Sequence, residues 1–404
     1  MSGVRDKILP ANRGAAIFND RGNGGVDATA FVEGIYSRSW GRTDVEWRVS
    51  YDRYSYLGKT HYPLDGGGIE DNRESDRTSW AGSKLTLRLN AGRAGQITAG
   101  AETRIDLQTM QSNYDVQPEY VSYVNVNRRD IRVGVFLQEE IALSEHWQAV
   151  AGARLDTSDY RENSVSPRAG LIWSPVESTA VKFLYGTSFR NPNSSEMFFA
   201  DGWTESGNPA LRPERGQDYE VVVERQFGTG LKLSASGYRT DLKNLIVGVR
   251  DDCGLLQYQN VSSDRIFGGD AEISGRFRGI DLASSFAVQN GFDTGTRSIL
   301  VNSPRPVAKV RFAVPLLRNH LTAAGAANWI GPRQTPHGDV VPWAAKTDVT
   351  LTTSNLGRGF DLQFGVRNLF DRKIWDPVAL NDLVDVMPRP GRQVFLRLIW
   401  RSED

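Results

Sequence analysis

Apolar and polar residues alternate along most of this 404-residue chain. One early segment places apolar side chains at every second position: Val45, Trp47, Val49 and Tyr51. The positions between them are polar or charged, and the same period returns around residues 131–137 and 362–366. A period of two is that of a β-strand with one apolar and one wet face. Helical spacing is not sustained anywhere, so the pattern predicts an all-β chain.

Seventeen segments are predicted to be strands: 28–39, 43–56, 78–90, 95–107, 129–142, 146–157, 166–174, 178–188, 216–226, 229–241, 257–276, 278–292, 303–316, 318–331, 345–356, 360–370 and 391–401. Tight turns alternate with long connections, which are predicted at 57–77, 108–128, 189–215, 332–344 and 371–390. Short turns on one rim and long loops on the other are typical of a transmembrane barrel. The prediction is therefore an antiparallel up-and-down transmembrane β-barrel.

A soluble β-sandwich or propeller is the alternative architecture, because both also contain amphipathic strands. A propeller would repeat itself about every 40–50 residues, and no such repeat is present. A sandwich would not confine its long loops to every second connection. The barrel accounts for both observations.

Composition excludes several other classes of protein. The 48 basic and 48 acidic residues are scattered, so there is no basic patch for nucleic acid. The single cysteine cannot form an internal disulfide, and the four histidines lack the spacing of metal ligands. No apolar run reaches the roughly 18 residues of a spanning helix. Residues 1–27 form a polar segment without an export signal, expected to be disordered or the remnant of a missing part, and residues 28–404 form the barrel domain.

Two motif regions are sharper than the rest of the pattern. The first contains Tyr185, Gly186, Phe189, Arg190, Pro192, Glu196, Asn208, Pro209, Leu211, Pro213, Glu214, Tyr219 and Glu220. The second contains Asn368, Leu369, Phe370, Pro390, Gly391 and Arg392. Both regions, in this order, resemble the barrel of TonB-dependent outer-membrane receptors. Proline donates no ladder hydrogen bond, so Pro192 is expected to end a strand at a long loop. The motif residues are expected to shape that loop and the barrel rim.

The resemblance covers residues 28–401 and implies a function. Members of this family have a barrel of about 22 strands around an N-terminal plug. With 17 strands predicted, and neither plug nor TonB box in sight, the chain is expected to be the C-terminal part of such a barrel, from a truncated gene or an incomplete sequence. The family implies uptake of a scarce, bulky ligand across the outer membrane, driven by TonB–ExbB–ExbD through the missing plug. A ferric siderophore is the expected ligand, with cobalamin or haem as alternatives.

No covalent chemistry is implied, so neither catalytic residues nor a cofactor nor a bound metal is expected. Two other functions stay open at this point. A passive outer-membrane porin would share the strands but need no plug, and a soluble β-rich binding protein would need no membrane.

Aromatic and cationic residues in the predicted loops are the candidates for ligand contact, because they suit large, flat or anionic ligands. They are Tyr114, Tyr120, Phe198, Phe199, Trp203, Arg250, Trp343 and Trp375. Tyrosine and tryptophan at strand ends are also expected in the interfacial girdle of a barrel. His61 and His337 lie in predicted outer loops, where haem ligation and plain surface exposure are the two interpretations.

Overall fold

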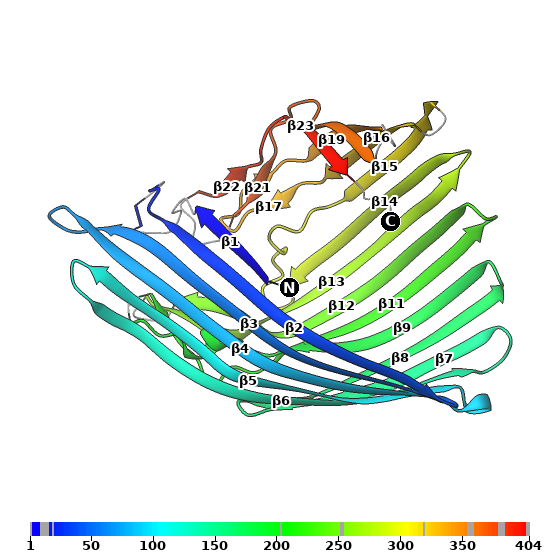
Figure 1. The fold of residues 1–404 in the computed structure, drawn as a ribbon, viewed down its shortest axis with the longest axis horizontal. Helices are drawn as coiled ribbons and strands as arrows, with labels where there is room; N and C mark the ends of the chain where they lie inside the picture. Colours follow the sequence, from blue (N-terminus) through cyan, green and yellow to red (C-terminus); the bar gives the residue numbers. More distant parts are fainter. Residues whose placement is uncertain are drawn as a thin grey trace. The chain divides into compact units, whose positions relative to one another are not determined.

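The computed structural model is built almost entirely of strands (Figure 1). It describes residues 2–8 (backbone only), 16–17, 20–202, 204–250, 254–317, 320–353, 359–378 and 384–400. The strands are β1 (Ser2–Ile8), β2 (Gly24–Trp40), β3 (Thr43–Pro63), β4 (Ile69–Asn90), β5 (Gln96–Gln117), β6 (Val121–Ala142), β7 (Trp147–Ser158), β8 (Arg161–Val176), β9 (Thr179–Arg190), β10 (Glu205–Ser206), β11 (Glu214–Phe227), β12 (Leu231–Arg250), β13 (Leu256–Phe277), β14 (Ile280–Asp293), β15 (Val307–Leu316), β16 (Leu321–Ile330), β17 (Arg333–Gln334), β18 (Val340–Val341), β19 (Ala344–Thr353), β20 (Phe360–Arg367), β21 (Trp375–Pro377), β22 (Val386–Pro388) and β23 (Gln393–Trp400). The helical elements are η1 (Gly92–Ala94) and α1 (Ser194–Phe198).

The chain divides into two compact units. Unit 1 comprises residues Met1–Leu171, Tyr185–Gln217 and Asp241–Asp264. Unit 2 comprises Ile172–Leu184, Asp218–Thr240 and Arg265–Asp404. No helix in the described ranges is long and apolar enough to cross a bilayer.

In unit 1, each strand from β2 to β6 pairs antiparallel with the strand that follows it along the chain. The ladders are long: β4, β5 and β6 each contain 22 residues. Figure 1 shows β2 to β6, coloured blue to cyan, running side by side. Sequential antiparallel pairing is the up-and-down arrangement that the sequence predicts.

All seventeen predicted strands are present, but two of the predicted loops are wrong. The segments 57–77 and 108–128 consist mostly of strand, because β3 and β4 are joined by residues 64–68 alone and β5 and β6 by residues 118–120. Both faces of these strand ends carry polar side chains, so the apolar period that marks a strand is lost there. The backbone ladder continues nevertheless, since its hydrogen bonds do not depend on side-chain polarity.

Short elements also occur where the sequence predicts none. Residues 2–8 form β1, which pairs antiparallel with the start of β2. The predicted loop 189–215 contains α1 and β10, and the predicted loops 332–344 and 371–390 contain the hairpins β17–β18 and β21–β22. The strands β10, β17, β18, β21 and β22 have only two or three residues, too few to show a hydrophobic period. The seven residues of β1 do not alternate between apolar and polar side chains.

The two faces of the unit 1 strands have opposite character. Exposed apolar side chains occupy one face, with Trp47, Leu85 and Val135 exposed by 49%, 39% and 46%. The other face buries carboxylates, and Asp106 and Asp130 are exposed by only 3% and 5%. A water-soluble protein has the reverse distribution. We call these the apolar face and the polar face; the former suits lipid and the latter a polar lumen.

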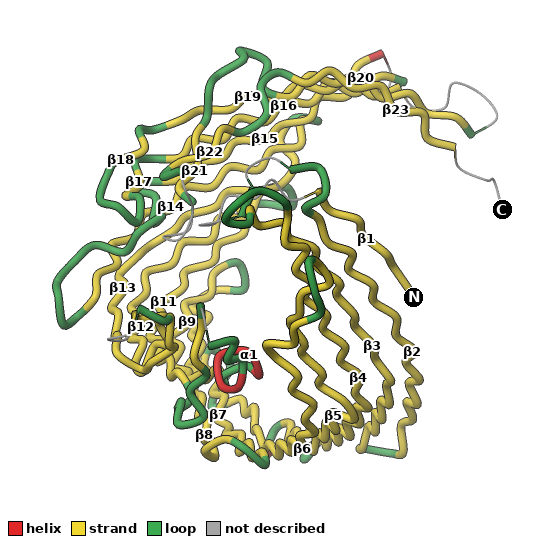
Figure 2. Tube along the Cα trace, turned by 90° about the vertical axis from the view of Figure 1, so that its left-hand side faces the viewer, coloured by secondary structure: helices red, strands yellow, loops and turns green. Residues whose placement is uncertain are grey.

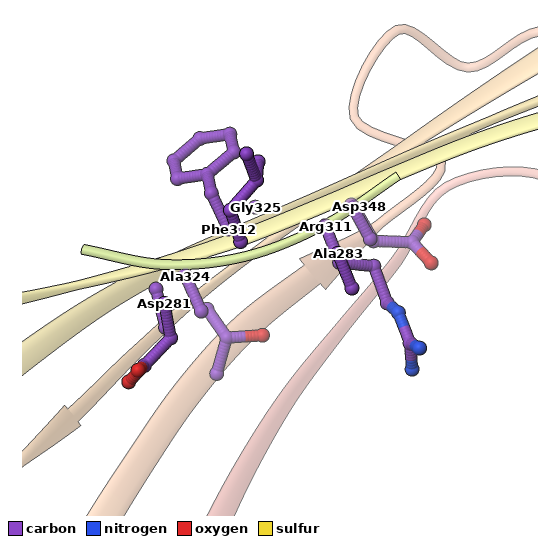
Figure 3. A pocket seen from close by; sticks show the side chains of 11 residues that line it. Asp281, Ala283, Arg311, Phe312, Ala324, Gly325 and Asp348 are labelled. Carbon is purple, nitrogen blue, oxygen red and sulfur yellow. The ribbon is translucent and has the colours of Figure 1, made fainter. Parts of the chain in front are cut away.

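Unit 2 has the same division between its faces. Strands β14, β15, β16, β19, β20 and β23 pair antiparallel in that order. A shallow pocket of about 380 Å³ lies against β14 to β19 (Figure 3). Figure 3 shows Phe312 on one side of the strands and Asp281 and Arg311 on the other. Alanines 283, 313, 324 and 326 line the pocket, so its wall is largely of small side chains.

Candidate functional site at the α1 loop

The connection from β9 to β11, residues 191–213, is the longest one in unit 1, and we call it the α1 loop. Figure 2 shows α1, in red, near β7 and β8. A reciprocal capping box starts the helix: the Asn193 side chain accepts a hydrogen bond from the Glu196 amide, and the Glu196 carboxylate accepts one from the Asn193 amide, both at 2.8 Å. This pair satisfies two of the amides that a helix start leaves free. A helix of five residues needs such support because it is too short to be stable alone.

Arg190 joins both ends of the α1 loop. Its Nε and Nη2 donate to the two carboxylate oxygens of Glu214 at 2.6 and 2.9 Å, and its Nη1 donates to Glu196 at 3.1 Å. Glu214 also accepts from the amide of Ile246 at 2.8 Å. Planar, two-point pairing of this kind fixes orientation as well as charge. The end of β9, the helix and the start of β11 are therefore held together at one guanidinium.

The returning half of the α1 loop is fixed through the backbone. The Asn208 amide donates to the Glu196 carbonyl at 3.2 Å, and its side chain donates to the Tyr258 carbonyl at 2.8 Å. Leu211 is buried at 5% exposure, and Pro192 and Pro213 are fully buried. Glu196, Asn208, Leu211, Pro192 and Pro213 all belong to the first motif region, whereas Tyr258 lies outside it. Their contacts are those of a loop-shaping role, which remains the prediction for them.

A ladder of alternating charges runs along the polar face towards the α1 loop: Arg104, Asp106, Arg132, Asp130 and Arg161. Arg132 donates to Asp106 and to Asp130, both at 2.8 Å. Arg161 pairs with Asp130, and its Nε donates to the carbonyl of Pro192 at 3.0 Å. The carboxylates are almost fully buried and each has two cationic partners, which offsets the cost of burial. The ladder attaches the α1 loop to the strands beside it.

One arginine beside this ladder has a different environment. The Arg128 guanidinium lies 3.7 Å from the centre of the Phe198 ring and 5.9 Å from that of Tyr160. The Phe198 and Tyr160 rings meet edge to face, with centres 6.2 Å apart. Among the described residues no carboxylate pairs with Arg128, whereas Arg104, Arg132, Arg161 and Arg190 are all paired. We call Arg128, Tyr160 and Phe198 the α1 site.

Sequence reasoning identified one member of the α1 site, Phe198. Arg128 and Tyr160 were missed, because an arginine inside a strand and a tyrosine in a two-residue turn carry no signal of their own. Only the folding of the α1 loop across β6 and the β7–β8 turn brings the three together.

The other candidates in unit 1 lie in separate places. Tyr114 and Tyr120 form a pair near the β5–β6 turn, with ring centres 5.7 Å apart. Phe199 is the residue that ends α1. Arg250 donates to the Gly254 carbonyl at 2.8 Å. Trp203 lies outside the described residues.

In unit 2, Trp343 stacks edge to face on Trp329, with ring centres 6.3 Å apart. Trp329 is 43% exposed and lies on the same strand face as Gly325. The Phe312 ring packs over Gly325, where a Cβ would lie 2.6 Å from its Cζ. An exposed pair of indoles on an apolar face is the arrangement expected of an interfacial girdle. This contact favours the girdle interpretation of Trp343.

Trp375 begins the β21–β22 hairpin, and its carbonyl accepts from Arg333 Nη2 at 2.7 Å. Arg333 is buried and also pairs with Asp376 at 2.9 Å, and Arg389 donates to both oxygens of Asp376 at 2.5 and 2.9 Å. Arg389 and, with a smaller effect, Arg333 hold the pKa of Asp376 below its ordinary value of 3.8. An ion pair between Arg333 and Asp376 therefore joins the connections 331–343 and 368–392.

The second motif region forms a tight turn after β20. Asn368 has a positive φ of 51°, and its side chain exchanges two hydrogen bonds of 2.9 Å with the backbone of Arg372. The amide of Arg392 donates to Asp371 at 2.7 Å, and a Cβ on Gly391 would lie 2.8 Å from the same carboxylate. Leu369 donates its amide to the Thr347 carbonyl, while Phe370 is 64% exposed. These contacts again suit a structural role.

Both candidate histidines pair with a carboxylate. His61 belongs to β3 rather than to a loop, and its Nδ1 lies 2.8 Å from Asp20. His337 pairs with Asp385 at 2.9 Å. Within the described ranges no three His, Cys, Asp or Glu side chains gather as a metal site would require.

Comparison with known proteins identifies related barrels. The family model described as "TonB dependent receptor-like, beta-barrel" matches residues 6–369. The "Heme/hemopexin utilization protein C" of Haemophilus influenzae is 25% identical over 260 residues, which cover 54% of this chain and 36% of that protein. A "Probable hemoglobin and hemoglobin-haptoglobin-binding protein 4" of the same organism is also 25% identical, with 67% of this chain and 32% of that protein covered. The chain thus spans about a third of the length of these relatives.

Solved structures agree in fold. The "Pyoverdine outer membrane receptor FpvA" from Pseudomonas aeruginosa bound to pyoverdine superposes with a TM-score of 0.78 at 13% identity, covering 99% of this chain and 67% of that one. The siderophore receptor PiuA from Acinetobacter baumannii has a TM-score of 0.73 at 15% identity, covering 93% and 64%. At these identities the likeness concerns the fold alone.

Proposed function

Because the chain belongs to the TonB-dependent receptor-like β-barrel family and is an outer-membrane β-barrel protein, we propose that it forms the wall of a receptor for a ferric siderophore. The family consists of receptors and not of enzymes. Uptake of the ligand would be driven by the TonB–ExbB–ExbD system acting on a plug. The apolar face would contact outer-membrane lipid, and the polar face would line the path of the ligand.

The α1 site is the observation that carries this proposal. Arg128 is an exposed cation without a described carboxylate partner, and its guanidinium carbon lies 3.7 Å from the centre of the Phe198 ring. A guanidinium held in this way offers N–H donors to an anionic oxygen beside an aromatic surface. Ferric chelates of catecholate or carboxylate type present both anionic oxygens and flat rings. The Arg190 contacts hold the α1 loop in place before a ligand arrives, which reduces the entropic cost of binding.

Haem is the second candidate ligand. Two relatives carry heme or hemoglobin in their names, and a flat porphyrin with two propionates would also suit an arginine stacked on a ring. Passive diffusion through a porin is the competing function. It would require neither an energy source nor a ligand site at the α1 loop.

Uptake of iron-55 tests the proposal. The gene that encodes this chain would be expressed at its full length in cells lacking their own iron receptors, with and without TonB. Catecholate, hydroxamate and citrate complexes of iron would be compared with hemin. We expect saturable, TonB-dependent uptake of a siderophore complex. Uptake of hemin alone would select the second candidate, and non-saturable uptake that persists without TonB would identify a porin.

A further inference from the structure

The strand register of unit 1 shows where the apolar face ends. Directly paired residues share a face, so each register row can be followed across β3, β4, β5 and β6. Four successive rows carry mostly apolar or small side chains. They contain Val45, Leu87, Ala99 and Leu137; Trp47, Leu85, Ala101 and Val135; Val49, Ser83, Thr103 and Val133; and Tyr51, Ala81, Ile105 and Ile131. These rows form the band of the apolar face that would contact hydrocarbon.

The next two rows, towards the β3–β4 and β5–β6 turns, contain three arginines. Arg53 pairs with Ser79, and Ser79 pairs with Gln108, next to a bulge in β5. Arg129 lies two residues before Ile131, on the same face of β6 and opposite that bulge. Arg77 lies one row further, paired with Ser55 and Met110. We call Arg53, Arg77 and Arg129 the arginine cluster.

All three guanidinium groups are available to a partner. Arg53, Arg77 and Arg129 are exposed, and none forms an ion pair with a described residue. Asp159, which follows β7 near Ile131, is engaged elsewhere, since its carboxylate accepts from the Ile131 amide at 3.2 Å. The α1 site contains the neighbouring Arg128, but on the opposite face of β6, because successive residues of a strand point to opposite sides.

Two further cations on this face do not belong to the cluster. Lys59 and Arg73 both pair with Asp71, at 3.4 and 2.9 Å, further along the strands. The rows on this face of β3 to β6 from Arg53 to His61 contain a single carboxylate among their described residues, that of Asp71. The face therefore keeps a net positive charge next to the hydrocarbon band.

We propose that the arginine cluster binds phosphate groups of a glycolipid head group in the outer leaflet of the outer membrane. The position of the arginine cluster indicates a lipid partner, because cations immediately beyond a hydrocarbon band lie at the depth of lipid head groups. Arginine is suited to phosphate because its planar fork donates two hydrogen bonds to adjacent oxygens. Strands lie about 4.8 Å apart, so the cluster covers about 15 Å across β3 to β6. That width matches one head group bearing more than one phosphate. The proposal concerns the lipid-facing surface and does not depend on which ligand is taken up.

Binding of lipid A to the purified full-length protein in detergent would test the proposal. Lipid A with its phosphate groups and enzymatically dephosphorylated lipid A would be titrated against wild type and a triple variant, Arg53→Gln, Arg77→Gln and Arg129→Gln. The matched control removes three arginines from elsewhere on β2 to β4: Arg38→Gln, Arg48→Gln and Arg88→Gln. A charge-retaining variant of the cluster with three lysines would also be measured. Migration of unboiled protein on gels would report whether each variant is folded.

We expect the triple glutamine variant to bind phosphorylated lipid A about a hundredfold more weakly than wild type, at about tenfold or less per arginine. The control variant should bind as wild type does, and the lysine variant should retain most of the affinity. Equal affinity for phosphorylated and dephosphorylated lipid A would overturn the proposal. So would an unchanged affinity of the folded triple variant, or full competition by free pyrophosphate at concentrations similar to those of the lipid, since the site would then bind phosphate without regard to the membrane.

Discussion

The guanidinium of Arg190 and the carboxylate of Glu214 form a two-point ion pair, with N–O distances of 2.6 and 2.9 Å, across the base of the α1 loop. The pair joins residues that are 24 positions apart, and the third nitrogen of the guanidinium holds Glu196. One side chain therefore joins the two ends of a loop of more than twenty residues.

Arg190→Lys should loosen the α1 loop. A lysine keeps the charge but cannot pair with two carboxylates in a plane. The loss leaves Glu196 and Glu214 with fewer donors, at a cost of about 1–3 kcal/mol. Limited proteolysis of intact cells should then cut within residues 191–213 faster than in wild type. A cleavage rate like that of wild type would show that the pair is dispensable for the loop.

Arg128→Gln should weaken ligand binding without loosening the α1 loop. Loss of charge-assisted hydrogen bonds of about 1.5–3 kcal/mol predicts a roughly tenfold or greater rise in Kd for an anionic ferric chelate. Arg129→Gln is the matched control, because it removes the same charge from the opposite face of β6. Equilibrium binding of iron-55 chelate to outer membranes would measure both. Equal affinity of the two variants would remove Arg128 from the ligand site.

Gly207→Ala should displace the return of the α1 loop, because a Cβ there would lie 2.7 Å from the backbone carbonyl oxygen of Met197. Backbone cannot give way as a flexible side chain can, so a cost of about 1–3 kcal/mol is expected. Gly186→Ala is the control within the same motif, since its Cβ would meet no atom within 4 Å. Thermal unfolding of the two variants should differ, and identical midpoints would contradict the packing argument.

The cross-link between connections 331–343 and 368–392 should weaken in acid. The pKa of Asp376 is lowered by Arg389 and Arg333, so its contribution to stability is fully present above the ordinary value of 3.8. The contribution is lost as the pH falls below 3.8 through the lower folded pKa. Proteolysis by pepsin at graded pH should show the hairpin opening over this range. Asp376→Asn should open more readily than wild type at pH 5, and the difference between the two proteins should disappear as the pH falls to 2.

The strands were predictable from sequence wherever one face met lipid. Val45 to Tyr51 alternate with polar residues, and the resulting period locates the ladder. Beyond Arg53 the side chains on both faces are mostly polar, so β3 and β4 continue through residues whose sequence is that of a loop. The α1 site could be predicted only in part. Phe198 stands out as a loop aromatic, but its contact with Arg128 joins residues 70 positions apart and depends on how the α1 loop folds back.

The length of the unit 1 strands affects what approaches the cell. With 22 residues, β4 is roughly 70 Å long, whereas about 9–11 residues suffice to cross a bilayer. The part of the wall beyond the lipid is thus a rigid sheet rather than a fringe of loops. An antibody or bacteriophage that docks there would bind side chains displayed in strand register, so a denatured peptide of the same sequence should not compete with the folded surface.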